Sequence, residues 1–331
     1  MAINLVNQQQ EWDRFIDASP YGLLYHKWNF LKLIEKYTGY QFLPYGIYKG
    51  EQLICVFPLF YKKIAFIKLL FSPPPQSGVP YLGLVMDKDY DHLKQDRKES
   101  HVNLVAKEID AEIKKIAPNY FAATLVPGFS DLRPFQWLKY QVDTSYTYIL
   151  DLKRGLEDIW ESFSSLGRQN IRKGESLQCK LVNTNDPGIL TKLLTGRYQE
   201  QGLHHGVGSA YLKELLEAYP KELVLHCLYD GEEIIGATLS QEYNRYIGWL
   251  GLVKAKDEKY KYANEFAIWQ FIRQAKSQGF NQFEVSGANK QSLCKYRAKF
   301  NPQLIAYYGL VKKDIFGKAA EAFYFNFIKK I

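Results

Sequence analysis

The second half of the chain carries the clearest pattern of hydrophobic and polar positions. Apolar and polar residues alternate on either side of Asp230-Gly231, a dipeptide that favours a two-residue hairpin turn. A second strand-like run covers 246–253, and apolar residues at helical spacing over 264–277 predict a helix. A last strand is expected at 281–286. The pattern therefore predicts a compact α/β unit of hairpin, strand, helix and strand.

An eight-residue pattern occurs twice in the sequence. Residues 47–54, IYKGEQLI, match residues 228–235, LYDGEEII, and both are typical of two strands joined by a glycine turn. Each octet is preceded by helical patterns and followed by a strand, a helix and another strand. This shared order predicts a duplicated domain, and each copy is expected to be a mixed, mostly antiparallel sheet flanked by helices. The expected domains are residues 1–145 and 146–331.

Composition narrows the class of protein. The chain has 331 residues, of which 47% are hydrophobic and 24% charged, as in a folded protein of one or two domains. A net charge of +8 favours anionic partners, although the basic residues are dispersed and a role in solubility alone stays open. We expect no DNA partner. The N-terminus lacks the pattern of a signal peptide and no run is long enough for a transmembrane helix, so a cytoplasmic location is expected.

The cysteines argue against a metal site. Four are present, far apart, with no Cys-x-x-Cys pair, and no His/Cys ligand spacing occurs elsewhere. We therefore expect no bound metal and no permanently bound cofactor.

Two segments combine aromatic or aliphatic residues with lysine. Residues 62–71 read KKIAFIKLLF, and a helix expected at 319–328 carries aromatic residues on all sides. A peripheral membrane contact is one interpretation of both segments. A strand edge or buried loop in the first segment, and burial or a partner contact in the second, are the alternatives.

Several short motifs follow one another in the second half. LDLK at 150–153 precedes Ile159-Trp160 and GRQNIRK at 167–173. A helical segment beginning at Asn264 ends in Ala-x-x-x-Gly, the strand QFEVSG ends at Gly287, and YRAKFN follows at 296–301. In this order the motifs resemble those of the FemAB-like transferases. That resemblance implies an α/β (α+β) fold of two tandem GNAT-like domains.

The resemblance also implies an activity. FemAB-like proteins transfer an aminoacyl group from aminoacyl-tRNA to a peptidoglycan precursor. We accordingly expect an acyltransferase that moves an aminoacyl or acyl group to an amine of an anionic cell-envelope, peptidoglycan or saccharide precursor. The donor is expected to be aminoacyl-tRNA or acyl-CoA. A coenzyme-A-dependent N-acetyltransferase and a non-catalytic protein that binds an anionic ligand remain as alternatives.

Besides lacking the helical-hairpin insertion that tRNA-synthetase-like members of the family carry, the chain departs from the family pattern at two places. Tyr296, Arg297 and Asn301 stand where the family has Phe, Lys and Gly. No glycine-rich loop precedes the helix at 264, where a coenzyme-A-dependent GNAT protein places the diphosphate. The second departure weakens the case for ordinary acetyl-CoA binding.

Acyl transfer to an amine requires a base and hydrogen-bond donors for the developing oxyanion. Glu242, late in a predicted strand, is the candidate base, because GNAT relatives often place one there. Tyr260 is a candidate acid, and Lys299 could hold a donor carbonyl. Each of these three side chains could instead have a purely structural role. A substrate groove is expected in the second half of the chain, beside its basic and aromatic segments. The candidate substrate-binding residues there are Arg168, Arg172, Lys173, His204, His205, Trp249, Tyr262, Asn264 and Arg297.

Overall fold

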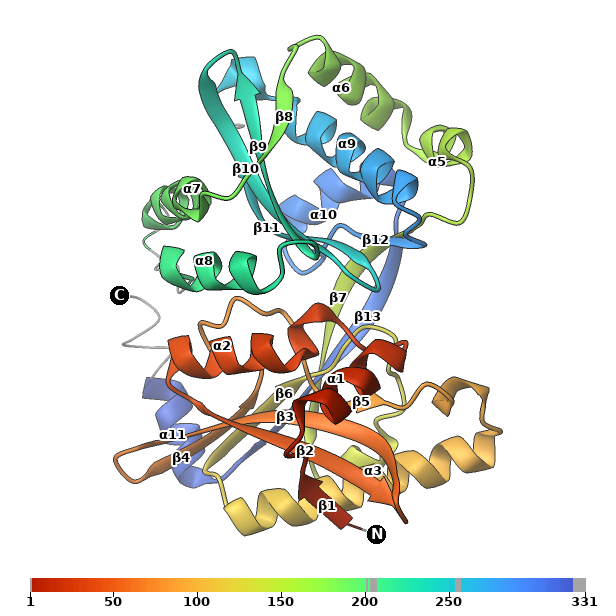
Figure 1. Ribbon diagram of the computed structural model, residues 1–331, viewed down its shortest axis with the longest axis vertical. Coiled ribbons are helices and arrows are strands. Elements are labelled where there is room, and N and C mark those ends of the chain that lie inside the picture. Colours follow the sequence, from red (N-terminus) through yellow and green to blue (C-terminus); the bar gives the residue numbers. More distant parts are fainter. Residues whose placement is uncertain (1, 201, 203–206, 254–256, 324–331) are drawn as a thin grey trace. The chain divides into compact units, whose positions relative to one another are not determined.

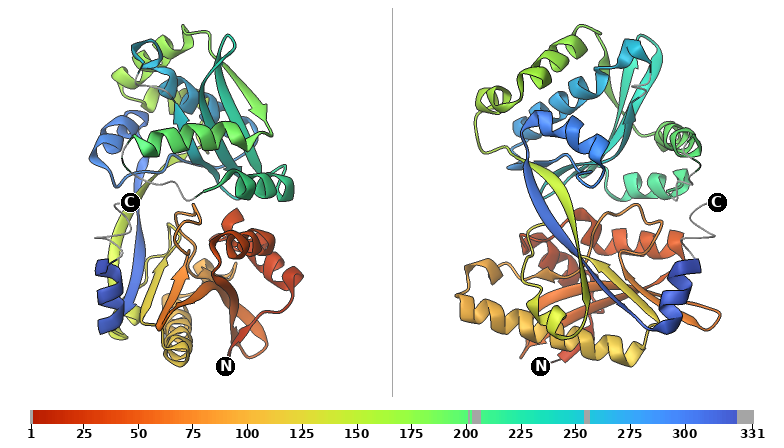
Figure 2. Two further views of the ribbon diagram at one scale, coloured as in Figure 1. Left: turned by 90° about the vertical axis from the view of Figure 1, so that its left-hand side faces the viewer. Right: turned by 180° about the vertical axis from the view of Figure 1, so that it is seen from behind.

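The computed structural model describes residues 2–200, 202, 207–253 and 257–323 (Figures 1 and 2). The chain forms two compact units, Met1–Ser145 with Ala306–Ile331, and Tyr146–Ile305. The sequence pattern placed everything after residue 145 in the second domain. The structure differs because the strand β13 (Gln303–Lys313) pairs with β6 (Tyr120–Thr124), which draws the end of the chain into the first unit.

The first unit is built on one sheet. Its strand order is β1-β2-β3-β4-β6-β13, and every pair is antiparallel except β4 with β6. A short strand, β5, also pairs with β3. The remaining strands are β1 (Ala2–Leu5), β2 (Gln41–Lys49), β3 (Gln52–Ile64), β4 (Ile67–Ser72) and β5 (Val85–Met86). The helices are α1 (Gln9–Ala18), α2 (Trp28–Thr38), α3 (Gln95–Ile116), α4 (Arg133–Trp137) and α11 (Ile315–Phe323).

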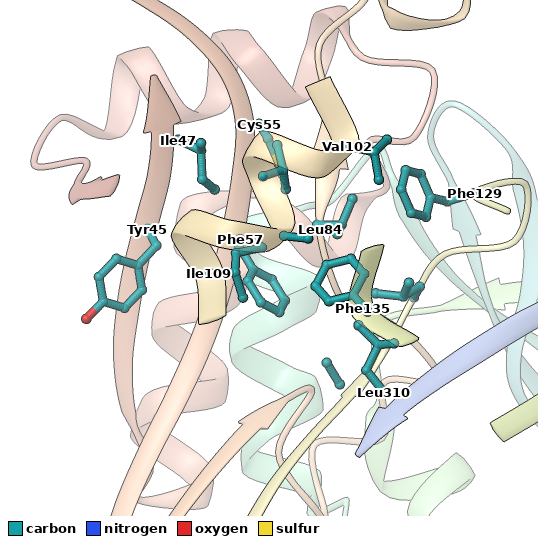
Figure 3. Packing of buried hydrophobic residues seen from close by; sticks show 14 of the residues in the cluster. Tyr45, Ile47, Cys55, Phe57, Leu84, Val102, Ile109, Phe129, Phe135 and Leu310 are labelled. Carbon is teal, nitrogen blue, oxygen red and sulfur yellow. The ribbon is translucent and has the colours of Figure 1, made fainter. Parts of the chain in front are cut away.

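Helix α3 covers this sheet with a continuous apolar stripe. Val102 and Ile109, two turns apart on one side of the helix, belong to one buried cluster with Phe57 and Leu84, and Ile109 lies beside Phe57 (Figure 3). All four side chains are buried. The 3.6-residue period of α3 and the two-residue period of β3 therefore meet in one core.

The second unit also has a single, mostly antiparallel sheet. Its order is β7-β12-β11-β10-β9-β8, in which only β11 and β12 run parallel. The strands are β7 (Gln141–Asp151), β8 (Lys180–Thr184), β9 (Leu223–Asp230), β10 (Glu233–Glu242), β11 (Tyr246–Val253) and β12 (Gln282–Glu284). The helices are α5 (Leu156–Ser162), α6 (Ser165–Glu175), α7 (Pro187–Gln199), α8 (Ser209–Ala218), α9 (Ala263–Ser277) and α10 (Gln291–Arg297). Figures 1 and 2 show α5, α6 and α9 on one side of this sheet and α7 and α8 on the other.

The two repeated octets form matching hairpins. β2 and β3 turn at Gly50 with φ +65°, and β9 and β10 turn at Gly231 with φ +58°. A β-bulge follows each turn, and its extra residue is Ile54 in the first unit and Ile235 in the second. Ile54 and Ile235 are equivalent positions of the octet, and both are fully buried. The two units therefore share the β-bulge as well as the octet sequence. This confirms the expected fold class of two related mixed domains.

Candidate functional site

A cavity of about 1600 Å³ opens in the second unit where β11 and β12 separate. The two parallel strands pair through Tyr246 with Phe283 and Ile247 with Glu284. Past this point Gly248, Trp249, Gly251 and the segment from Val285 to Gly287 contribute to the cavity lining. No further strand is inserted between them among the described residues, so the β11–β12 ladder ends at Ile247 and Glu284.

A bulge in β11 lies at the same place. Leu239 pairs with Leu250 and Ser240 with Gly248, which leaves Trp249 as the extra residue. A bulge bends its strand and re-aims the side chain that it carries. Trp249, expected as a substrate-binding residue, lines the cavity.

Helices from both sides of the sheet complete the lining. Asn264, Ala267 and Phe271 come from α9, and Lys192, Leu193 and Gly196 come from α7. The cationic lining residues are Lys192, Arg197, Lys290 and Arg297. The carboxylates are Glu200, Glu232, Glu233, Asp257 and Glu284. The cavity therefore offers both charge signs together with an aromatic surface.

Arg297 is tied to the loop that follows β12. Its guanidinium donates to the carbonyl oxygen of Ser286 and lies against Gly287, whose φ of +67° turns the chain there. Burial lowers the pKa of Arg297 from its ordinary value. The Nε of Arg297 and the hydroxyl of Tyr296 are buried and have no hydrogen-bond partner within the described part of the chain. Both residues are among those that line the cavity.

Glu284 is a lining residue that the sequence reasoning missed. It is 1% exposed, accepts from the Thr147 hydroxyl at 2.7 Å and pairs with Arg245 at 2.9 Å. It sits at the last β11–β12 pair, at the base of the opening. A charged residue between Phe283 and Val285, the two apolar residues of the short strand expected at 281–286, was the available signal.

The candidate base Glu242 lies elsewhere. Its carboxylate accepts from Ser240 at 3.1 Å, Gln274 at 3.2 Å and Gln278 at 2.8 Å, in a buried cluster under the C-terminal end of α9. Glu242 is not among the cavity-lining residues. The strand-end position was foreseen, but the glutamines of α9 that enclose it were not.

Tyr260 and Lys299 are not lining residues themselves, although Tyr260 contacts the lining residue Glu233. The Tyr260 hydroxyl donates to Asp230 at 2.9 Å and to Glu233 at 3.2 Å. Burial, and then the hydrogen bond to Asp230, raises the pKa of Tyr260. The Lys299 ammonium pairs with the buried carboxylate of Glu265 at 3.0 Å.

The basic segment of α6 faces away from the cavity as well. Arg168 donates to the carbonyl oxygens of Glu161 at 2.8 Å and Phe163 at 2.6 Å, so it satisfies the end of α5. Arg172 and Lys173 are exposed; Arg172 lies 5.7 Å from the Trp160 ring centre, and the ammonium of Lys173 lies 5.1 Å from that of Tyr262. His204 and His205 lie outside the described residues.

The described residues hold no candidate metal cluster and no candidate membrane span. No three His, Cys, Asp or Glu side chains gather there as a metal ion would require. None of the helices described is both long enough and apolar enough to span a bilayer.

Comparisons with known proteins find similarity in structure. No protein-family model matches the sequence, and a search of curated proteins returns no match. The solved structure of FemX superposes with a TM-score of 0.69 at 12% identity and covers 93% of this chain and 97% of its own. L-PGS from Bacillus licheniformis gives 0.56 at 13% identity, with coverage of 93% and 92%.

A third structure bears on the duplication. A tandem GNAT protein from the clavulanic acid biosynthesis pathway, solved without AcCoA, gives a TM-score of 0.52 at 10% identity and covers 95% of this chain and 99% of its own. These similarities extend over nearly the whole of each chain. The protein therefore has the tandem GNAT fold that FemX shares, as the sequence motifs predicted.

Proposed function

We propose that the protein is an acyltransferase that transfers an aminoacyl or acyl group to an amine of a cell-envelope or saccharide precursor. The opening between β11 and β12 is the observation that carries this proposal, because it joins the end of the β11–β12 ladder, an aromatic side chain and a cationic side chain in one cavity. The fold of FemX and of L-PGS supports it.

The proposed reaction is an aminolysis. The acceptor amine attacks the acyl carbonyl carbon, a C–N bond forms, the bond to the donor oxygen or sulfur breaks, and the proton that the amine loses is passed to that departing atom. Backbone N–H groups of the β11 edge and the cation of Arg297 would stabilise the oxyanion. Carboxylates of the lining would receive the proton from the amine, directly or through water.

The first turn of α9 helps to decide between acyl-CoA and aminoacyl-tRNA as the acyl donor. Glu265 is 3% exposed in this turn and pairs with Lys299 at 3.0 Å, so an ion pair occupies the helix end where a phosphate would otherwise be stabilised. α6 packs against this turn so closely that a Cβ on Gly174 would lie 2.7 Å from the Tyr262 carbonyl oxygen. Both features disfavour a coenzyme A diphosphate at this helix end, so we favour aminoacyl-tRNA as the donor.

The test begins with mass spectrometry of RNA and small molecules that purify with the full-length protein. Transfer is then assayed with charged tRNA or acyl-CoA as donor and amine-bearing envelope precursors as acceptors. Consumption of charged tRNA with appearance of an amide product is the expected result. Turnover with acyl-CoA alone would support the N-acetyltransferase, and precursor binding without turnover by either donor would support the non-catalytic binding protein.

A pair of variants ties transfer to the cavity. Trp249→Ala removes the aromatic lining residue and should lower kcat/KM about tenfold or more. Trp137→Ala changes an exposed tryptophan on α4 of the other unit and should leave kcat/KM unchanged. Equal activity of Trp249→Ala and wild type, with both proteins folded, would contradict the assignment of the site.

A further inference from the structure

One surface of the first unit exposes an unusual group of large apolar side chains. Ile64 and Phe66, at the tip of the β3–β4 hairpin, are 53% and 72% exposed. Ile315 and Phe316, in the first turn of α11, are 75% and 55% exposed. The two pairs come from segments about 250 residues apart, and the rings of Phe66 and Phe316 meet edge to face with centroids 6.3 Å apart. They therefore form one patch rather than four scattered exposures.

Contacts on the inner side of α11 determine which of its residues face outward. Gly317 packs against the Asn119 carbonyl oxygen with no room for a Cβ. The Tyr120 hydroxyl donates to Glu321 at 3.0 Å, one turn further along the helix. These contacts hold α11 beside β4 and β6, as Figure 1 shows, and leave Ile315 and Phe316 on its outer side.

Lysine flanks the patch. Residues 62–68 include three lysines and no carboxylate, and Lys63 is exposed beside Ile64. Lys318 is exposed on α11, whereas Glu321 is neutralised by Lys313. Asp314 is the acidic group at the start of the helix, and it accepts hydrogen bonds from Asn119 and Gly317. The exposed charge next to the apolar tips is thus mainly positive.

We propose that Ile64, Phe66, Ile315 and Phe316, flanked by Lys63 and Lys318, dock on an anionic lipid bilayer. Aromatic and aliphatic tips enter the acyl boundary while lysines contact anionic headgroups, which is the division of roles in interfacial binding. A bilayer fits better than a protein groove, because the apolar residues lie at a hairpin tip and a helix end rather than in a concave surface. This proposal goes beyond the transfer reaction and does not depend on it.

The test is sedimentation of the full-length protein with vesicles. Wild type is expected to bind vesicles of phosphatidylglycerol and phosphatidylcholine in equal parts, and to bind pure phosphatidylcholine about tenfold more weakly. The double variant Phe66→Ser/Phe316→Ser should bind the mixed vesicles about tenfold or more weakly than wild type. Trp137→Ser is the matched control, since it removes an aromatic residue that is 61% exposed elsewhere in the same unit, and it should bind like wild type.

Circular dichroism without lipid shows whether each variant is folded, and sedimentation velocity without lipid shows its oligomeric state. The double variant should keep the wild-type melting temperature, because its substituted side chains are exposed. Wild type that fails to sediment with the mixed vesicles, or a double variant that sediments as wild type does, would overturn the proposal. A wild-type dimer that the double variant converts to monomer would assign the patch to self-association instead. If Phe66→Ser/Phe316→Ser unfolds, Lys63→Ser/Lys318→Ser replaces it, and unchanged binding by that variant would equally overturn the proposal.

Discussion

The ammonium of Lys299 lies 3.0 Å from the carboxylate of Glu265 in the first turn of α9. Asn170, on α6, donates to the same carboxylate oxygen at 2.9 Å. Three segments that are distant in sequence therefore meet at one buried anion. Lys299 serves first as the counter-ion that lets Glu265 remain buried.

The first prediction concerns this ion pair. Lys299→Met should lower the free energy of unfolding by about 2–4 kcal/mol, because the buried carboxylate keeps only the neutral Asn170 as a partner. Urea denaturation followed by fluorescence measures the change. Lys295→Met, at an exposed position of α10, should stay within about 0.5 kcal/mol of wild type. Equal stability of the two variants would contradict the structural role of the pair.

The second prediction separates backbone strain from displacement of Arg297. Gly287 and Gly279 both have positive φ, +67° and +84°, but only a Cβ on Gly287 would collide with the Arg297 guanidinium. Both alanine variants should lose about 1–2 kcal/mol of stability. Only Gly287→Ala should also lower kcat/KM for transfer, by about tenfold or more, since Arg297 must leave its place beside the cavity. A similar loss of activity in Gly279→Ala would show that strain alone accounts for it.

The third prediction contrasts two helical glycines. A Cβ on Gly174 would lie 2.7 Å from the Tyr262 carbonyl oxygen, whereas one on Gly196 meets nothing within 4 Å. Gly174→Ala should destabilise the protein by about 1–3 kcal/mol, because α6 must move away from α9. Gly196→Ala should stabilise it by up to about 1 kcal/mol through the helix propensity of alanine. Thermal melts of the two variants against wild type should shift in opposite directions; shifts of the same sign would contradict the close α6–α9 packing.

The fourth prediction is a dependence of stability on pH. The buried ring of His26 accepts from the Leu23 amide at 3.1 Å and lies 3.2 Å from the Leu82 carbonyl oxygen. Burial lowers its pKa to about 4 from the ordinary 6.5. The unfolded chain therefore binds a proton in this window that the folded chain does not, so the free energy of unfolding falls as pH drops from 6.5 to 4. The contribution is at most about 1.4 kcal/mol per pH unit.

Urea titrations across that pH range check the slope. His26→Gln should flatten the dependence while lowering stability overall, because one buried titratable group is removed. His92→Gln, at an exposed position, should leave the slope as in wild type. An unchanged slope in His26→Gln would place the origin of the acid sensitivity in other groups.

Part of the cavity lining could be predicted from the sequence, because some lining residues belong to short local motifs. Trp249, Asn264 and Arg297 were proposed from short motifs, and all three line the cavity. Each lies at a feature that the local pattern marks, namely a strand rich in glycine, a helix start and a basic segment after a strand. Glu242 and Tyr260 were proposed in the same way, yet Gln278 and Asp230 hold them in contacts that no local pattern reveals.

The fold was predictable because it rests on periodicity. The sequence by itself determined the two hairpins, since Gly50 and Gly231 provide positive φ between alternating apolar runs. Tertiary structure alone decided that β13 pairs with β6, that β11 and β12 separate past Ile247, and that Glu284 lies at the base of the opening. Strand partners and ion-pair partners distant in the chain depend on how whole faces pack, and that information is spread over many residues rather than carried by any one segment.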